Sequence, residues 1–206
     1  MTFSSMRHHA RQRGLAAVEF ALLLPLLLLL LFGTIDAARA LQANIIMVNI
    51  GREGANLVAR GSTQLETGSQ DIIYALMASA PPLDVKRQGM VYITRLMGVA
   101  SGKTTRNVVI DQYRWDDAAR NLGYRASGYA PASAVYTCTS WSGGQCSGIN
   151  SKNRPSSTVM DGKLGDGEVV YVVETFYRFD MFMTAFATDT LSLPTFGPDL
   201  YSMTVF

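Results

Sequence analysis

The stretch GLAAVEFALLLPLLLLLLFGTI, residues 14–35, decides how this chain is organised. From Leu15 to Ile35 it runs for 21 residues with a single charged side chain, Glu19. A helix rises about 1.5 Å per residue, so this length spans the roughly 30 Å hydrocarbon core of a bilayer. The sequence therefore predicts a membrane-spanning helix over residues 15–35. Because a charge inside such a run is costly to insert, Glu19 is a candidate functional residue.

Charged residues on either side of the apolar run predict its orientation. Arg7, Arg11 and Arg13 precede it, whereas Asp36 and Arg39 follow it and cancel. Cationic flanks of membrane helices tend to stay in the cytoplasm, so we expect the N-terminus inside and the C-terminal part outside. After those three arginines the chain has 15 of its 18 basic residues against 16 acidic ones. That balance has no basic surplus for a nucleic-acid partner.

The helix is predicted to continue beyond the bilayer, over residues 36–60, because this segment contains no proline. Apolar residues recur in it at helical spacing and predict one buried stripe: Ala38, Leu41, Ile45, Val48 and Ala55. Gly51 and Gly54 weaken the helix by about 1 kcal/mol each relative to alanine. Gly61 is a candidate C-terminal stop.

The sequence from residue 61 to residue 206 predicts an exported α+β domain. A short helix is expected over residues 70–80, with Ser69 as its N-cap and Pro81-Pro82 at its end. Segments rich in Val, Ile, Tyr and Phe then predict an antiparallel sheet of about four strands: residues 90–97, 107–115, 168–180 and 200–206. Residues 98–104 are expected to form a hairpin loop between the first two strands.

A long insertion rich in Ser, Gly and Asn, at about residues 116–167, separates the second and third predicted strands. Loops of this length are usually functional or mobile. A short strand is expected inside it, over residues 134–139. The insertion also holds both cysteines, Cys138 and Cys146. In an exported domain a disulfide is the favoured interpretation, followed by free thiols, since a metal site needs more ligands than this loop offers.

Several enzyme-like patterns are better explained by structure. GVASGKT, residues 98–104, has three residues between its glycines where a phosphate-binding loop has four. DGKLGDGE, residues 161–168, departs from the calcium-loop spacing, and its Asp-Gly pairs are typical of turns. Both histidines, His8 and His9, precede the apolar run, which removes histidine-dependent catalysis from the rest of the chain. We expect neither an enzyme nor a cofactor.

The start of the apolar run resembles the cleavage junction of type IV prepilins. Gly14 precedes Leu15, Glu19 is the fifth residue counted from Leu15, and a long apolar helix follows at once. Three further stretches are similar to the TadE-like proteins of the tight-adherence (Tad/Flp) pilus system: AVEFALLLP (17–25), LLLLLLFGTIDAARAL (26–41) and REGA (52–55). The resemblance covers about residues 13–60.

This resemblance implies a minor pilin or pseudopilin, which is a structural subunit. A prepilin peptidase would cut after Gly14, remove the leader of residues 1–14 and leave Leu15 as the new N-terminus. Glu19 would neutralise the terminal amine of a neighbouring subunit, because an unpaired desolvated charge costs about 3 to 5 kcal/mol. The alternative is that Glu19 only reaches the headgroups. Pro25 either allows a local kink during assembly or is a tolerated membrane proline.

The same resemblance implies the partners and the location. The expected partners are the prepilin peptidase, other pilin-like minor subunits, the major pilin, the inner-membrane assembly machinery and membrane lipid. The expected location is the bacterial inner membrane, as a single-pass protein with its C-terminal domain in the periplasm, or the extracellular pilus.

A second processing signal supports a different interpretation. Ala38-Arg39-Ala40 fits the small-x-small rule of the secretory signal peptidase. Cleavage there would release a soluble periplasmic or extracellular binding domain that starts at Leu41. The apolar run is longer than the usual core of a signal peptide, and Glu19 would be out of place in one, so we favour the pilin-like interpretation.

Overall fold

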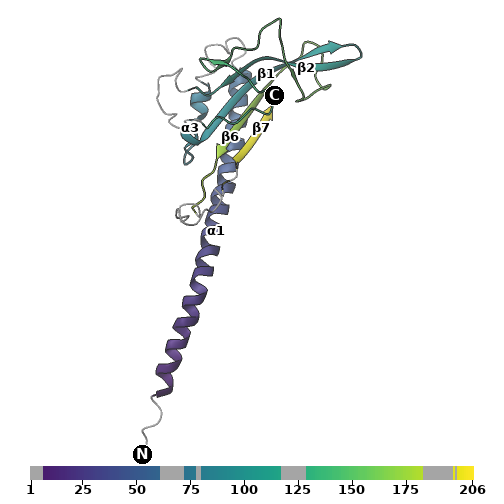
Figure 1. Cartoon of the computed structure of the whole chain (residues 1–206). Helices are drawn as coiled ribbons and strands as arrows, with labels where there is room; N and C mark the ends of the chain where they lie inside the picture. Colours follow the sequence, from purple (N-terminus) through teal and green to yellow (C-terminus); the bar gives the residue numbers. More distant parts are fainter. Residues whose placement is uncertain (1–6, 61–71, 78–79, 117–128, 183–196, 198) are drawn as a thin grey trace, which may run out of the picture. The chain divides into compact units, whose positions relative to one another are not determined.

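The computed structural model describes residues 7–60, 72–77, 80–116, 129–182, 197 and 199–206. The chain divides into two compact units. The first unit comprises residues 1–41 and 180–196, and the second, the outer unit, comprises residues 42–179 and 197–206. Figure 1 shows a long N-terminal helix and a sheet, which confirms the predicted α+β class.

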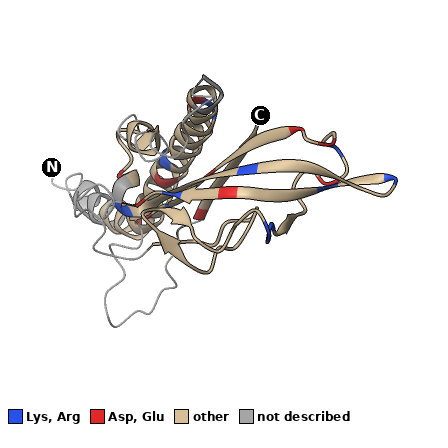
Figure 2. Cartoon of the chain, turned by 90° about the horizontal axis from the view of Figure 1, so that it is seen from above, with Lys and Arg blue, Asp and Glu red and all other residues tan. Residues whose placement is uncertain are grey.

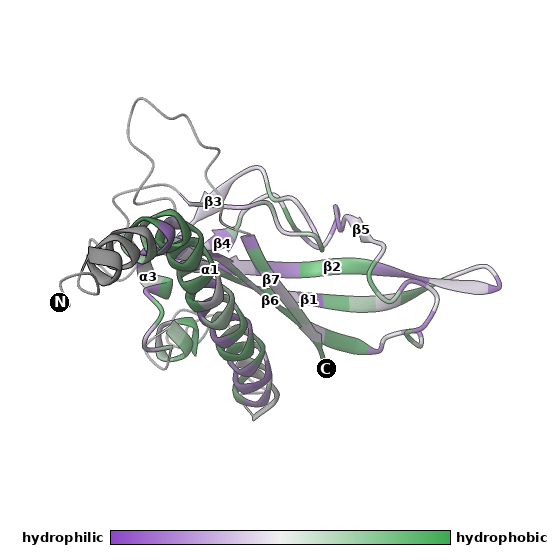
Figure 3. Cartoon of the chain, turned by 90° about the horizontal axis from the view of Figure 1, so that it is seen from below, coloured by the Kyte–Doolittle hydropathy of each residue, from purple (hydrophilic) through white to green (hydrophobic). Residues whose placement is uncertain are grey.

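Helix α1 runs from Arg7 to Arg60 and continues through Pro25. It therefore begins within the predicted leader, eight residues before Leu15. The large apolar side chains between Val18 and Leu31 are all exposed, and the hydropathy colouring of Figure 3 shows how apolar much of this helix is. By length and composition, α1 is the one helix in the described part of the chain that could cross a membrane. The proposed stop at Gly61 lies outside the described residues.

The second unit is built on an antiparallel sheet whose four long strands match the predicted ones. They are β1 (Gly89–Ser101), β2 (Thr104–Arg114), β6 (Val169–Arg178) and β7 (Asp199–Val205). Three strands of two residues each were not predicted: β3 (Trp141–Ser142), β4 (Gln145–Cys146) and β5 (Ser156–Ser157). The sheet has seven strands in the order β3-β4-β2-β1-β6-β7, with β5 paired to β2. The expected number of about four was too low because the insertion adds short strands.

The predicted hairpin between β1 and β2 is confirmed, with a tighter turn than expected. Ser101 pairs with Thr104, so the loop consists of Gly102 and Lys103 alone. Gly102 has a φ of 68°, as the first central position of a type II′ turn requires. The register shifts between Arg95 and Leu96, which marks a β-bulge in the middle of the pair.

The helix predicted over residues 70–80 is confirmed in part. Residues 72–77 are helical, inside the predicted range 70–80, while Ser69 lies outside the described residues. A further short helix, α3 (Val85–Gln88), was not predicted. The Asp84 carboxylate accepts a hydrogen bond from the Arg87 backbone N–H at 3.3 Å and caps it.

The strand expected over residues 134–139 is absent, and that prediction was wrong. The backbone N–H of Ala134 donates to the Glu174 carboxylate at 2.9 Å. Those of Val135 and Tyr136 donate to the Ser133 hydroxyl at 3.2 and 3.3 Å. Side chains therefore use the backbone donors that a β-ladder would need.

The C-terminal part of α1 covers one face of the sheet, but with a different stripe from the one predicted. Leu41 and Ile45 are 67% and 61% exposed, and Ala38 is exposed as well. Of the predicted stripe only Ala55 is fully buried. The buried residues follow the same helical spacing on another face: Ala43, Met47, Ile50, Gly51, Gly54 and Ala55.

Two glycines allow this close approach of helix and sheet. A Cβ atom on Gly51 would lie 2.8 Å from the Thr204 hydroxyl oxygen of β7. One on Gly54 would lie 2.8 Å from a methyl carbon of Leu76 and 3.4 Å from one of Val173 on β6. The cost of glycine within a helix is thus offset by packing, because any larger residue would push the helix away from the sheet.

The insertion covers the opposite face of the sheet. Side chains alternate along β6, so Val173 faces α1 while Val172 and Glu174 face the insertion. The core on this side consists of buried apolar residues from strands and insertion: Leu96, Val109, Val135, Leu164, Val170 and Val172. Figure 2 shows charged residues of both signs scattered along the strands.

Candidate assembly helix and disulfide loop

The predicted cleavage junction lies inside helix α1. Gly14 and Leu15 are both helical, and Glu19 follows one turn later. Residues four apart lie on the same face of a helix, so the Glu19 carboxylate lies near the turn that begins at Leu15. Glu19 is exposed, and within the described part of the chain no residue makes a hydrogen bond or ion pair with it. Its charge therefore has no partner from the described residues.

The leucines that follow Glu19 form an apolar surface whose exposure to water is unfavourable. Leu22 is 74% exposed, and the other leucines as far as Leu31 are between 38% and 56% exposed. Burying one such side chain is worth about 1.5 to 3 kcal/mol. The apolar residues surround the helix on every side, which is typical of a membrane span. This surface is expected to be covered by lipid or by other apolar helices.

A buried aspartate holds a distant segment against the end of the apolar run. Asp36 is 2% exposed, and its carboxylate accepts a hydrogen bond from the backbone N–H of Phe182 at 2.9 Å. The same carboxylate accepts one from the Arg39 guanidinium at 3.4 Å. The Arg39 guanidinium carbon lies 4.1 Å from the centre of the Phe182 ring. Asp36, Arg39 and Phe182 form a cluster within the first unit.

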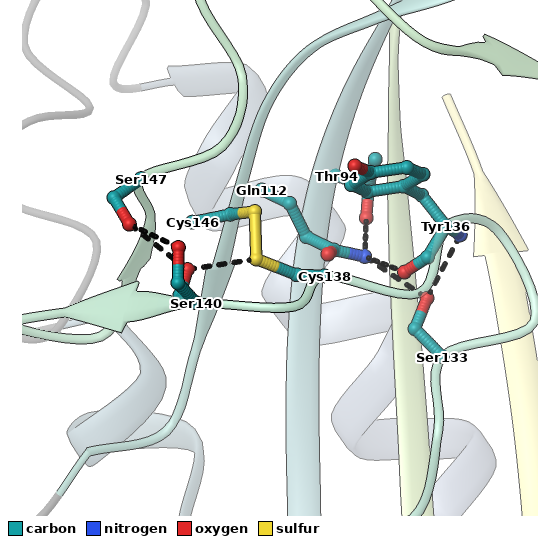
Figure 4. The surroundings of a disulfide bond; sticks show 8 residues. All are labelled: Thr94, Gln112, Ser133, Tyr136, Cys138, Ser140, Cys146 and Ser147. Carbon is teal, nitrogen blue, oxygen red and sulfur yellow. Dashed lines mark hydrogen bonds between the residues drawn. A yellow bond between two sulfur atoms is a disulfide. The ribbon is translucent and has the colours of Figure 1, made fainter.

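The two cysteines form the predicted disulfide, Cys138–Cys146, with Cα atoms 5.9 Å apart. The residues between them form the hairpin β3–β4 rather than an irregular loop. Gly143 and Gly144 have φ angles of 57° and 81°, the pattern of a type I′ turn. Figure 4 shows the bond beside Ser140 and Ser147, whose hydroxyls lie 2.6 Å apart. The disulfide closes the hairpin at its base.

The hairpin is attached to the edge of the sheet by β4. The backbone N–H of Arg114 donates to the carbonyl of Gly144 at 2.8 Å, and Gln145 pairs with Tyr113. The Gln145 amide also donates to the Tyr113 hydroxyl at 3.2 Å. The disulfide loop is therefore an extension of the sheet.

A buried polar network fixes the insertion to the centre of the sheet. Gln112 on β2 is fully buried, and its amide nitrogen lies within 3.1 Å of oxygen atoms of Thr94, Ser133 and Tyr136 (Figure 4). The Ser133 hydroxyl in turn donates to the carboxylate of Glu174 on β6. Because buried polar groups are costly unless they are paired, this network specifies where the insertion lies.

A cavity of about 190 Å³ lies between the insertion and strands β1 and β2. Tyr92, Arg114, Tyr136 and Trp141 contribute to its lining. The Arg114 guanidinium carbon lies 4.5 Å from the centre of the Trp141 ring. The volume is below the 300 to 1,000 Å³ of typical small-molecule sites. It would hold a side chain or a few water molecules.

Residues 14–56 match the family model of TadE-like proteins. The resemblance is confirmed for this TadE-like segment, residues 14–56, which contains the Gly14–Leu15 junction, Glu19, Pro25 and the whole buried stripe of α1. No curated protein and no solved structure matches the chain. The match thus covers most of helix α1, including its apolar run, and it ends before the sheet begins.

The TadE-like segment also contains residues whose roles the sequence did not reveal. Asp36 and Arg39 were considered only as flanking charges that cancel, yet Asp36 is buried and binds Phe182. The sequence signal that could have indicated a role for Asp36 was its position, as an acid directly after the apolar run. Beyond the TadE-like segment, Glu174 was missed in the same way, as a lone acid within an apolar strand. A buried carboxylate must be hydrogen-bonded, so both acids indicate distant partners.

The acids of the DGKLGDGE stretch beyond the TadE-like segment act in turns. Asp161 accepts a hydrogen bond from the Asn107 backbone N–H at 3.3 Å, and Asp166 accepts one from that of Ala100 at 2.8 Å. Glu168 accepts one from the Gly165 backbone N–H at 2.7 Å. These bonds connect the loop before β6 to the hairpin β1–β2. The turn interpretation of this stretch is confirmed.

Among the described residues of the outer unit, three have shifted pKa values. Burial, followed by the charge of Glu174 and the hydrogen bond to it, raises the pKa of Tyr201. Burial and the neighbouring Asp199 likewise raise the pKa of Tyr129. Burial lowers the pKa of Arg95, but the ion pair with Asp111 and a hydrogen bond with Tyr171 outweigh it, so the pKa is raised overall. Arg95 therefore stays charged on the sheet.

Proposed function

We propose that this chain is a pilin-like minor subunit of a Tad-type pilus. The observation that carries the proposal is the TadE-like match over residues 14–56. It covers the Gly14–Leu15 junction together with an exposed apolar helix that continues into the outer unit. A helix of this kind can serve first as a membrane anchor and then as a packing element among other subunits.

Cleavage after Gly14 would give Leu15 a cationic amine one helical turn from Glu19. The prepilin peptidase would make this cut at the cytoplasmic side. Glu19 would then pair with the amine of a neighbouring subunit, because an unpaired charge in the bilayer is more costly than a paired one. Glycine at the junction favours cleavage, since it lowers the free energy needed to unwind the helix there by about 1 kcal/mol relative to alanine.

The proposed role is structural, and the chain has no catalytic function in it. The protein would lie in the inner membrane with its N-terminus in the cytoplasm and its sheet in the periplasm, until it joins the pilus. Its partners would be the prepilin peptidase, the other pilin-like subunits, the major pilin and the assembly machinery. The three arginines before the anchor support this orientation.

A second candidate is a soluble domain released by signal peptidase after Ala40. One observation favours it, because the buried apolar residues of α1 begin at Ala43 and would all stay with the sheet after this cut. Against it, the TadE-like match continues across Ala40. The cavity of about 190 Å³ is also small for a dedicated binding domain. We therefore prefer the pilin-like role.

The intact mass of the protein, isolated from cells with an active prepilin peptidase, tests the proposal. We expect a chain that begins at Leu15 and a loss of this species in Gly14→Leu. The matched control is Gly33→Leu, a glycine of the same helix with open space around it, which should be processed normally. A chain that begins at Leu41 would establish the soluble alternative. A chain that keeps Met1 would exclude both.

A further inference from the structure

The position of Phe182 follows from its hydrogen bond to Asp36. Asp36 is the first residue after the apolar run, so it lies about 1.5 Å along the helix beyond Ile35. The headgroup layer on each side of a bilayer is roughly 5 to 7 Å thick. The backbone N–H of Phe182 lies 2.9 Å from the Asp36 carboxylate, within the same unit of the chain. If residues 15–35 cross the membrane, Phe182 lies at the level of the headgroups.

We propose that Phe182 and Arg39 form a second membrane contact, in which the lipid headgroup layer covers the exposed ring. This inference rests on the membrane anchoring assumed in the proposed function, but not on cleavage or on the pilus. The Phe182 ring is 47% exposed although it is large and apolar. Trp and Tyr concentrate at membrane interfaces because each combines an apolar ring with a polar group, and the Arg39 guanidinium over the Phe182 ring supplies the same combination.

Arg39 gives this contact its polar half. Its guanidinium carbon lies 4.1 Å from the centre of the Phe182 ring, and its side chain remains 41% exposed. A guanidinium at this depth can bind lipid phosphates while its stem lies along apolar surface. Ile35, one helical turn before Arg39, is 38% exposed and extends the apolar part.

Lipid is the preferred occupant because the length of the anchor sets the depth of Phe182. Leu15 to Ile35 fills the hydrocarbon core when the helix is upright, and a tilt would bring Asp36 closer to the core. A second copy of the chain could cover the ring as well, but nothing requires one at this depth. The contact would fix residues 180–182 to the membrane surface.

Tryptophan fluorescence of the full chain in lipid nanodiscs tests the proposal. Phe182→Trp is compared with the parent protein, whose Trp115 and Trp141 supply the background, in lipids brominated near the ester carbonyl or near the chain ends. Leu28→Trp, in the middle of the apolar run, is the matched control for depth. We expect the added emission of Phe182→Trp to be quenched more by bromine near the carbonyl, and that of Leu28→Trp more by bromine near the chain ends.

The other outcomes distinguish a failure of the lipid contact from a failure of the membrane anchor. Quenching of Leu28→Trp alone would overturn the contact while leaving the anchor in place. Quenching of neither variant would refute the membrane anchor of the proposed function. An added emission protected from both brominated lipid and aqueous acrylamide would overturn the proposal in favour of a contact between chains.

A further variant tests the part played by Asp36. Asp36→Ala, introduced into the Phe182→Trp protein, removes the acceptor of the residue 182 N–H. We expect the quenching by bromine near the carbonyl to fall toward the background of the parent protein. Unchanged quenching would show that Asp36 does not position the ring, which would overturn that part of the inference.

Discussion

The Ser133 hydroxyl donates a hydrogen bond to the Glu174 carboxylate, although 41 positions separate the two residues in the sequence. Glu174 is fully buried on β6 and also accepts hydrogen bonds from the Ala134 backbone N–H and the Tyr201 hydroxyl. One carboxylate thus joins the insertion, the centre of the sheet and the last strand. Loss of this acceptor leaves three donors without their partner.

Glu174→Ala should strongly destabilise the outer unit. Of the three donors the Ser133 hydroxyl is buried, and a buried donor without an acceptor costs about 1 to 3 kcal/mol, so we expect a loss of up to about 3 kcal/mol in the free energy of unfolding. Denaturant unfolding of the full chain in detergent, followed by tryptophan fluorescence, measures it. Glu168→Ala is the control, since Glu168 is exposed and accepts one hydrogen bond from Gly165. Equal effects of the two variants would contradict the role of the network.

Gly54→Ala should destabilise the same unit, although alanine is the better helix former by about 1 kcal/mol. The new Cβ would lie 2.8 Å from a methyl of Leu76, which is fully buried and cannot move freely. Overpacking of this kind costs about 1 to 3 kcal/mol. Gly33→Ala, with nothing within 4 Å, should leave the stability unchanged or raise it slightly. Denaturant unfolding compares the two, and a more stable Gly54→Ala would exclude the proposed close packing.

Replacing both cysteines by serine should lower the free energy of unfolding by about 2.5 kcal/mol, because a bond across a separation of 8 residues restricts the unfolded chain. The change should open the β3–β4 hairpin before the rest of the sheet. Limited proteolysis, with the cleavage sites located by mass spectrometry, should therefore find new cuts near Gly143. The same cuts should appear in the parent protein under reducing conditions. If the double variant is as resistant as the oxidised parent, the hairpin does not depend on the bond.

Alkaline pH should destabilise the outer unit through Tyr201 and Tyr129. The folded state raises the pKa of both phenols above their ordinary value of about 10. Above pH 10 the unfolded chain loses these protons while the folded chain keeps them, so the stability falls as the pH rises toward the folded pKa values. Below pH 10 their contribution is fully present. The midpoint of thermal unfolding should therefore fall less steeply above pH 10 in Tyr201→Phe than in the parent protein, and an equal slope would contradict the shift.

Glu19→Ala should still be cut after Gly14 but should be poorly incorporated into pili. The reason is that the amine of a neighbouring subunit would lose its partner in the bilayer. Immunoblots of sheared pili and of membranes measure the two pools, and intact mass reports the cleavage. Glu53→Ala, an exposed acid of the same helix beyond its apolar run, is the matched control. Normal piliation in Glu19→Ala would remove the charge-pairing role.

The long apolar helix and the long strands could be predicted because each depends on a local pattern. Twenty-one residues with a single charge predict a helix long enough to span a membrane, and β-branched and aromatic runs bounded by Gly, Asp or Pro predict strands. The disulfide followed from the spacing of two cysteines in one loop. The hairpin at Gly102 could also be predicted, because a glycine between two such runs is a local signal for a turn.

The buried face of α1 could not be predicted because apolar residues occur on two of its faces. Leu41 and Ile45 have the same spacing as Ala43 and Met47, so periodicity alone does not choose between them. The face with Gly51 packs against the sheet because glycine allows helix and sheet to approach more closely there. The network around Glu174 was equally hidden, since its members are far apart in the sequence and meet only in the folded chain.

The packing of residues 43–55 of α1 on the sheet affects how the protein responds to force. A pull on the anchor would reach the outer unit along a helix whose hydrogen bonds run parallel to the load. To move α1, the pull would then have to slide the face that holds Gly51 and Gly54 across β6 and β7. Many contacts would have to break at the same time. Tension would thus be distributed over the sheet rather than concentrated on a flexible joint.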